Sequence, residues 1–309
     1  MRPLKIAIIG FGKIARDQHL PAIEANPRFA FVASVDRSGN GPVPNFTSHQ
    51  DLLASGLEID CAAITTPPSV RYAIARDCLA AGLHLLLEKP PTGTLGEIED
   101  LAPRAKEKDV SLFTTWHAQH NPAVPVAAEA LRGQRVRSMR VTWHEDVSKW
   151  HPGQKWIWQP GGFGVFDPGI NAFSIMTRIF PGPLFVRQAR LAFPEGAHTP
   201  VAAEIYLGTP EYEADLHCSL DWRKSEGEEW TIALTLEDGR TVELRDGGAR
   251  LFINGEEQAS TGAGEYPDIY REFVDLIDAR ESHVDMAPLR LVADCLLLAE
   301  RQSVVAIDN

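Results

Sequence analysis

The sequence contains few cysteines, and their spacing excludes the common cysteine-based sites. The 309 residues include four, which are Cys61, Cys78, Cys218 and Cys295, and no two of them form a Cys-x-x-Cys pair. Cys61 falls in an apolar, strand-like run, while Cys78 and Cys295 fall in amphipathic, helix-like segments. Such a pattern is typical of free, buried thiols in a reducing compartment. We therefore expect a cytoplasmic protein and, because no cluster of residues has metal-ligand spacing, no bound metal.

Positive charge is also scarce. Lys and Arg number 30 against 42 Asp and Glu, which gives a formal net charge of −12 at pH 7. Nucleic acids and anionic membrane surfaces repel such a chain, so we expect neither as a partner. No apolar run is long enough to span a bilayer, and the first strand-like run begins at Leu4, which leaves no room for a signal peptide.

The chain has enough length and apolar content for two domains. Hydrophobic residues make up 44% and charged residues 23%, as in globular proteins with a substantial core. Residues 4–114 alternate strand-like and helix-like segments, which predicts a parallel, doubly wound sheet. Later segments alternate apolar and polar residues between hairpin-type turns, and two helices, 266–279 and 288–304, are expected to close the chain.

We therefore expect an α/β protein with two domains. The first, over residues 1–118, is a dinucleotide-binding Rossmann domain. The second, over residues 119–309, is an α+β domain with a large, mostly antiparallel sheet that binds substrate and mediates self-association. An alternative left open is that the last helix of the chain packs on the Rossmann domain.

The clearest motif lies at the start of the chain. The apolar run Leu4–Ile9 is followed by Gly10, Gly12 and Ala15, the spacing of the dinucleotide fingerprint G-x-G-x-x-A. The first glycine permits a tight turn, the second lets a pyrophosphate approach the backbone, and the N–H groups of the following helix hold the phosphates. The alternative is a strand–turn–helix unit whose glycines serve packing alone. A second apolar run, Phe29–Val35, is followed directly by Asp36, and this context favours dinucleotide binding.

Asp36 also bears on which dinucleotide binds. A carboxylate at this place bonds the ribose hydroxyls of NAD and repels the 2′-phosphate of NADP, whereas the neighbouring Arg37 could accept that phosphate. We expect NAD, with NADP tolerated. The remaining residues expected at the cofactor lie in loops near the same sheet edge: Lys13, Ile14, Thr66, Pro67 and Glu88.

Lys89 is the first candidate catalytic residue. It is the second residue after the strand-like run His84–Leu87, so it lies at the carboxyl end of a parallel strand, where the cofactor crevice is expected. Partial burial there lowers the pKa of a lysine and lets it exchange protons near neutral pH. The alternative is a surface lysine in a turn, which is the commoner fate of lysine. The stiff Pro90-Pro91 that follows favours the functional interpretation.

Taken together, these motifs resemble the Gfo/Idh/MocA oxidoreductases. The resemblance extends over the whole chain and depends on Gly-Phe-Gly-Lys-Ile-Ala, on Glu88-Lys89-Pro90 and on the C-terminal sheet. It implies a Rossmann domain followed by a sheet domain, with Lys89 at the nicotinamide. It also implies that the Lys89–Pro90 bond is often cis, as X–Pro bonds can be.

The second domain departs from the family pattern at one residue. The family signature D-x-G-x-H corresponds here to Asp167-Pro168-Gly169-Ile170-Asn171. Because an amide cannot act as a general base, Asn171 cannot take the role of the usual histidine. This stretch and the loop before it resemble a narrower branch, the L-arabinose and D-galactose 1-dehydrogenases, which oxidise the anomeric carbon of an aldose to a lactone.

Asp167 and Asn171 are accordingly the other two candidate catalytic residues. Asp167 before Pro168 is also a good helix N-cap, and capping is the alternative to a catalytic role. Asn171 lies four residues later, on the same helix face. Proton abstraction is expected from Lys89 or Asp167, with Asn171 orienting the substrate.

A tryptophan-rich loop completes the expected sugar site. Glu145 and His151 flank Trp150, and Trp156 follows. We expect the carboxylate and the imidazole to bind sugar hydroxyls, and the indoles of Trp150, Trp156 and Trp158 to stack on a pyranose. The alternative for the tryptophans is a hydrophobic cluster between the domains.

The expected function is NAD(P)-dependent oxidation of a galactose-configured aldose at C1, with D-galactose, L-arabinose and D-fucose as candidate substrates. Two alternatives remain open at this point. One is another oxidoreductase of the family, of the inositol or glucose–fructose type. The other is a catalytically silent NAD-binding regulator. The area of the second sheet also predicts a homo-oligomer, most simply a dimer.

Overall fold

The computed structural model describes residues 2–39, 41 and 44–306, and the chain divides into two compact units. The first unit contains the chain up to His117 together with Ala263–Met286. The second contains Ala118–Gly262 and the stretch from Ala287 onward. The division therefore differs from the expected one, because a later segment returns to the first unit. The helix that returns is α8 (Glu265–Ala279), whereas the last helix, α9 (Ala287–Leu298), belongs to the second unit.

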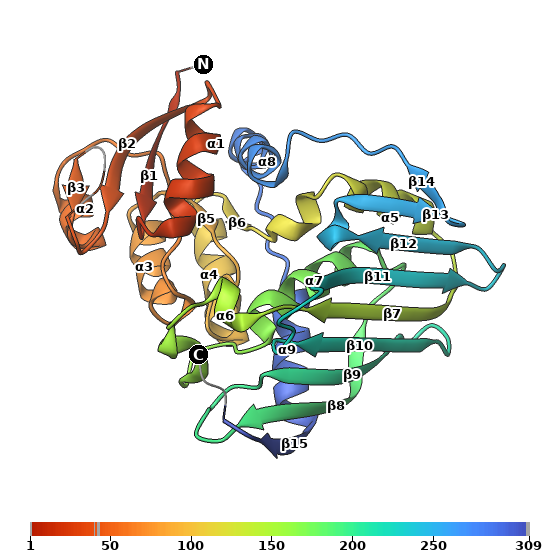
Figure 1. Ribbon diagram of the computed structural model, residues 1–309. Helices are drawn as coiled ribbons and strands as arrows, with labels where there is room; N and C mark the ends of the chain where they lie inside the picture. The colour runs from red at the N-terminus through yellow and green to blue at the C-terminus, as the bar shows by residue number, and fades with distance from the viewer. Residues whose placement is uncertain (1, 40, 42–43, 307–309) are drawn as a thin grey trace. The chain divides into compact units, whose positions relative to one another are not determined.

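A parallel sheet forms the centre of the first unit (Figure 1). In the described residues it has six strands in the order β3-β2-β1-β4-β5-β6, and every neighbouring pair is parallel. The strand order reverses between β1 and β4, which is where open α/β sheets bind ligands. The doubly wound prediction is confirmed. The strands are β1 (Leu4–Ile9), β2 (Phe29–Val35), β3 (Asn45–Phe46), β4 (Cys61–Ile64), β5 (His84–Leu87) and β6 (Leu112–Thr114).

The central strands are apolar along their length because helices connect and cover them. All of β4 and the last three residues of β5 are buried, as expected for parallel strands that pack on both faces. Helix α8 contributes Tyr266, Tyr270 and Phe273 to the same hydrophobic core as Ile6 and Ile8 of β1. The other helical segments of this unit are η1 (Ala15–His19), α1 (Leu20–Glu24), α2 (His49–Ala54), α3 (Pro68–Ala80) and α4 (Leu95–Glu107).

The second unit is built on a larger, mixed sheet. Within the described residues it has nine strands in the order β14-β13-β12-β11-β7-β10-β9-β8-β15, parallel at β7–β10 and β8–β15 and antiparallel elsewhere. The predicted large, mostly antiparallel sheet is thus confirmed. The strands are β7 (Val136–His144), β8 (Phe185–Pro194), β9 (Ala202–Gly208), β10 (Asp215–Asp221), β11 (Glu229–Leu236), β12 (Thr241–Arg245), β13 (Arg250–Ile253), β14 (Glu256–Gln258) and β15 (Ala299–Val304).

Buried and exposed residues alternate along the strands of this sheet, as along β10. The pattern indicates one covered face and one more open face. Helices α5 (Ala123–Leu131), α7 (Phe166–Ile179) and α9 pack against the sheet. The shorter segments η2 (His117–His120), α6 (Val147–Trp150), η3 (Lys155–Trp158) and η4 (Asp246–Gly248) connect the larger elements.

The end of the chain corrects one prediction. A helix was expected over 288–304, but α9 ends at Leu298 and the next six residues form the edge strand β15, parallel to β8. Ala299, Glu300, Arg301 and Gln302 favour a helix by intrinsic propensity. Tertiary pairing overrides that preference, because β15 bonds through its backbone and leaves most of its side chains exposed.

Two smaller expectations concern cysteines and membranes. All four cysteines are buried free thiols. None of the helices in the described ranges is long and apolar enough to cross a bilayer.

Candidate functional site

The glycine turn after β1 has the geometry that dinucleotide binding needs. Gly10 has φ +98°, and a Cβ there would lie 2.8 Å from both Cγ2 and the backbone nitrogen of Thr66. Gly10 is therefore required by the turn itself. At Gly12 a Cβ would meet no described atom within 4 Å. Since packing does not demand glycine there, the open space fits a ligand that approaches the backbone closely.

Thr66, in the loop after β4, supplies a second indication of a ligand. Its Oγ1 is buried and has no hydrogen-bond partner among the described residues. Its neighbour Thr65 donates from Oγ1 to the carbonyl of Gly10 at 2.5 Å, which ties this loop to the glycine turn. A buried hydroxyl of this kind calls for a partner from outside the protein, such as a ligand or water. The turn and this loop together fit a dinucleotide.

Asp36 lies where the ribose contact was expected, immediately after β2. Its Oδ1 accepts hydrogen bonds from the amide and the hydroxyl of Ser38, both at 2.8 Å. These bonds lower the pKa of Asp36 and keep it ionised. Both of these bonds fall on Oδ1, so Ser38 does not use Oδ2, and the neighbouring Arg37 is exposed. Of the other predicted cofactor residues, Lys13 and Pro67 are exposed, Ile14 is 39% exposed, and Lys13 pairs with Asp17.

Lys89 follows β5 and is half-buried, and its peptide bond to Pro90 is cis, as the family resemblance implied. Because β1, β2, β4 and β5 are parallel, the residues that follow them share the carboxyl edge of one sheet. The first unit thus places Gly10, Asp36, Thr66 and Lys89 along the same edge.

Glu88 has a different position from the other predicted cofactor residues. It is buried, and its Oε1 accepts from the Tyr266 hydroxyl at 2.6 Å and lies 3.3 Å from Nε2 of His19. Burial raises the pKa of Glu88, but the hydrogen bond and charge of His19, the charge of His117 and the Tyr266 hydroxyl bring it down to about 2. The carboxylate is therefore held inside the first unit by protein groups.

In the second unit, Asp167 pairs with His151. Helix α7 begins at Phe166, so the N-cap position falls on Val165 and the alternative of a capping role for Asp167 is excluded. Asp167 instead lies in the first turn, with Oδ2 3.3 Å from Nε2 of His151. Asn171 is one turn further along α7 and half-buried like Asp167. Two of the predicted site residues, far apart in sequence, thus meet.

Glu145 is buried and held by two indoles that sequence reasoning did not single out. Trp143 and Trp230 both donate from Nε1 to Oε1 of Glu145, at 3.0 and 2.9 Å. These tryptophans are register partners on β7 and β11. Only the pairing of β7 with β11 brings the two tryptophans together, so nothing in the local sequence indicates that both bond Glu145.

Of the three tryptophans predicted to stack on a sugar, Trp150 and Trp156 are exposed, whereas Trp158 is half-buried beside Trp222, with 5.6 Å between the ring centres. Trp150 is 47% and Trp156 41% exposed. Their indole nitrogens donate to Glu228 at 2.6 Å and to Gln154 at 3.0 Å, which fixes the rings. The ammonium of Lys149 lies 4.8 Å from the centre of the Trp150 ring, so one face of that ring contacts a cation.

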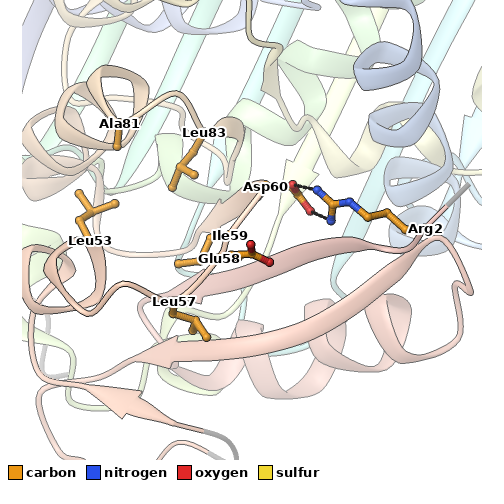
Figure 2. Close-up of a pocket in the computed structure, with 8 residues that line it drawn as sticks. All are labelled: Arg2, Leu53, Leu57, Glu58, Ile59, Asp60, Ala81 and Leu83. Atoms are coloured by element: carbon orange, nitrogen blue, oxygen red, sulfur yellow. Dashed lines mark hydrogen bonds and ion pairs between the residues drawn. The ribbon is translucent and has the colours of Figure 1, made fainter.

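A pocket of about 390 Å³ lies elsewhere in the first unit. Figure 2 shows it beside the paired side chains of Arg2 and Asp60. Asp60 precedes β4, so this pocket is at the amino edge of the sheet, opposite the glycine turn. None of the predicted site residues lines it. Over the described ranges, no group of three or more His, Cys, Asp and Glu is arranged to hold a metal ion.

Comparison with known proteins agrees with this geometry. The model of an oxidoreductase family with an NAD-binding Rossmann fold matches residues 4–115. Over 307 residues, 99% of both chains, this protein is 43% identical to a galactose 1-dehydrogenase from Pseudomonas fluorescens. The chain belongs to the Gfo/Idh/MocA oxidoreductase family.

Solved structures support the same family. A structure of a D-galactose-1-dehydrogenase protein from Rhizobium etli superposes with a TM-score of 0.95, at 43% identity, over 100% of this chain and 99% of that one. A 3-ketoreductase from Actinomadura kijaniata, solved with NADP and TDP-benzene, has a TM-score of 0.81 at 18% identity over 98% of this chain and 99% of that one. The second likeness shows the fold alone. The resemblance inferred from the motifs is confirmed for the whole chain.

Proposed function

We propose that this protein is an NAD-dependent aldose 1-dehydrogenase that oxidises a galactose-configured sugar to its lactone. The observation that carries the proposal is the 43% identity with a galactose 1-dehydrogenase over 99% of both chains. Lys89 after β5 and the Asp167–His151 pair support it, because they are groups suited to removing a proton from a hydroxyl. D-Galactose, L-arabinose and D-fucose are the candidate substrates.

The chemistry requires two events at C1 of the sugar. When bound, the nicotinamide supplies the acceptor for the hydride that leaves C1. The C1 hydroxyl must lose its proton, and we assign that proton to Lys89 or Asp167. Asn171 holds a hydroxyl without taking its proton, and His151 keeps the Asp167 carboxylate in place. Glu145, Trp150 and Trp156 are assigned to binding and orienting the ring.

Steady-state assays test this function directly. Absorbance of the reduced nicotinamide is followed with a panel of aldoses and with both NAD and NADP. The expected result is the highest kcat/KM with galactose-configured sugars and NAD, with a lactone as product. Turnover confined to inositols or to another sugar carbon would replace the assignment with another oxidoreductase of the family. NAD binding without turnover of any substrate would favour a regulator.

Asp36 provides a test of cofactor choice. Replacing it by alanine removes the carboxylate that favours the ribose hydroxyls and repels a 2′-phosphate. The ratio of kcat/KM for NAD over NADP should fall by about 10- to 100-fold, the value of a hydrogen bond to a charged group. Glu58→Ala, which removes an exposed carboxylate from the same unit, is the control and should leave the ratio unchanged. A ratio that does not move in Asp36→Ala contradicts the assignment.

We also propose that the enzyme is a homodimer. The nine-stranded sheet has helices packed against it, and its strands alternate buried with more exposed residues, which leaves one open face for a second copy. Tyr206 of β9 is 40% exposed. Light scattering should give twice the mass of one chain, and a monomeric mass at assay concentration would reject the dimer.

A further inference from the structure

The loop that carries Lys89 is held by two buried, charged side chains that the proposed chemistry does not use. Glu88 is 4% exposed and Arg71, on α3, is 2% exposed. Burying a charge is costly unless hydrogen bonds compensate for the lost water. Both residues meet that condition by bonding to the backbone on either side of Lys89, which points to a role for them at this loop.

Glu88 fixes the backbone amide of Lys89. Its Oε2 accepts a hydrogen bond from the Lys89 N–H at 2.5 Å. Its Oε1 accepts from the hydroxyl of Tyr266 at 2.6 Å and lies 3.3 Å from Nε2 of His19, which in turn contacts the Tyr270 hydroxyl through Nδ1 at 2.8 Å. Tyr266 belongs to α8 and His19 to η1. Helix α8 and segment η1 therefore both fix the Glu88 carboxylate, which in turn bonds the Lys89 amide.

Arg71 fixes the carbonyl groups around the same residue. One of its terminal nitrogens donates to the carbonyls of Glu88 and Pro90, the residues on either side of Lys89. The other donates to the carbonyl of Thr66, in the loop beside the glycine turn. The planar, forked guanidinium can serve several acceptors at fixed angles, which the ammonium of a lysine does not match. Arg71 thus joins the Lys89 loop to the expected cofactor loop.

We propose that Glu88, held by Tyr266 and His19, and Arg71 are positioning residues that set the direction in which the Lys89 side chain leaves the end of β5. The proposal rests on the proposed function, in which Lys89 acts at the reacting carbon. The N–H of Lys89 is bonded to a carboxylate, and the carbonyls of the residues before and after it are bonded to a guanidinium, so little freedom remains in this turn. Neither residue needs to touch sugar or cofactor for this role.

Tyr266→Phe tests the proposal with the smallest change. It removes a hydroxyl that bonds Glu88 and keeps the ring in the core. We expect kcat to fall about tenfold, because sub-ångström misplacement of a catalytic group is costly. KM for the sugar and for NAD should stay within about twofold, since binding is not altered. A purely structural role would lower the melting temperature without this separation of kcat from KM.

Tyr72→Phe is the matched control. Its hydroxyl also donates to a carboxylate in the first unit, Asp100 Oδ2, at 2.8 Å, and this bond is not one of those that hold the Lys89 backbone. It should leave kcat unchanged. Three further variants measure how the effect depends on each contact, and they replace Tyr266→Phe if that variant folds poorly. Glu88→Gln keeps an acceptor for the Lys89 amide and should retain more activity than Glu88→Leu, and Arg71→Lys should lose activity although it keeps its charge.

A second readout needs neither sugar nor cofactor. Reductive methylation with ¹³C-formaldehyde labels each lysine, and loss of one resonance in Lys89→Arg assigns Lys89. We expect Tyr266→Phe to shift or broaden the Lys89 resonance and Tyr72→Phe to leave it in place. If the wild type oxidises no aldose, the proposed function is wrong. The positioning role is then tested by the Lys89 resonance alone. An unmoved Lys89 resonance in Tyr266→Phe, or an unchanged kcat in an active enzyme, overturns the proposal.

Discussion

Replacing Lys89 by alanine should lower kcat about a thousandfold while NAD affinity and folding stay intact, because a positioned acid–base group contributes about 10²- to 10⁴-fold. Lys89 is half-buried at the carboxyl end of β5, on the sheet edge that also carries the glycine turn. Alanine removes the amine without altering the cis bond to Pro90 or the buried contacts of Glu88. The measurement is steady-state kcat, with fluorescence titration of NADH and a thermal melt to verify binding and folding.

Two companion variants define what Lys89 contributes. Lys89→Arg keeps a positive charge but cannot release its proton at working pH, so it should be nearly as slow as the alanine variant. Lys106→Ala, on α4, removes an exposed lysine of the same unit and should have wild-type kcat. An acid–base group contributes about 10²- to 10⁴-fold to the rate. If Lys89→Ala keeps kcat within about threefold of wild type, Lys89 is therefore not the acid–base group.

Asp167→Asn should give the second large loss, about a hundredfold or more in kcat. Asparagine has nearly the same shape, so it preserves the first turn of α7 and can still bond His151, but it cannot take a proton. A carboxylate near a helix N-terminus is also favoured by about 0.5 kcal/mol, so a small drop in melting temperature should accompany the change. Kinetics and a thermal melt separate the two effects.

Asp268→Asn is a matched control for this change. Asp268 lies in the first turn of α8, as Asp167 does in α7, and pairs with Arg271. It should show a similar small loss of stability and an unchanged kcat. Equal kcat values for Asp167→Asn and wild type would remove Asp167 from the chemistry and leave it a partner of His151.

The double variant Lys89→Ala with Asp167→Asn separates two assignments of the base. Residues that act as one unit show effects that do not add. If Lys89 and Asp167 handle the same proton, the double variant should be about as slow as the slower single variant. If each makes an independent contribution, the losses in kcat multiply.

The fold could be predicted from sequence wherever the signal is local. Gly10 is recognisable because a tight turn after a buried strand demands it, and the alternation of apolar runs with helices fixes a parallel sheet. The edge strand β15 could not be predicted, because its residues favour a helix and only pairing with β8 makes it a strand. The same limit explains α8, whose return to the first unit depends on packing between distant segments.

The candidate site shows the same division. Asp36 is the first residue after β2 and Lys89 the second residue after β5, so their positions follow from the strands themselves. The partners of these and other site residues are non-local: Tyr266 is 178 residues from Glu88, and the Trp143–Trp230 pair that holds Glu145 exists only through the β7–β11 register. Capping was the alternative role for Asp167 because Asp-Pro favours helix starts locally. Helix α7 begins two residues earlier than that role requires, so Asp167 lies in its first turn and pairs with His151.

The central claim is that the hydrogen on C1 of the sugar is the one transferred. D-Galactose deuterated at C1 provides the most direct measurement, with mass spectrometry of the reduced cofactor after a single turnover. The account predicts one deuterium in each reduced cofactor and galactonolactone as the product. Reduced cofactor without deuterium would place the oxidation at another carbon and contradict the account.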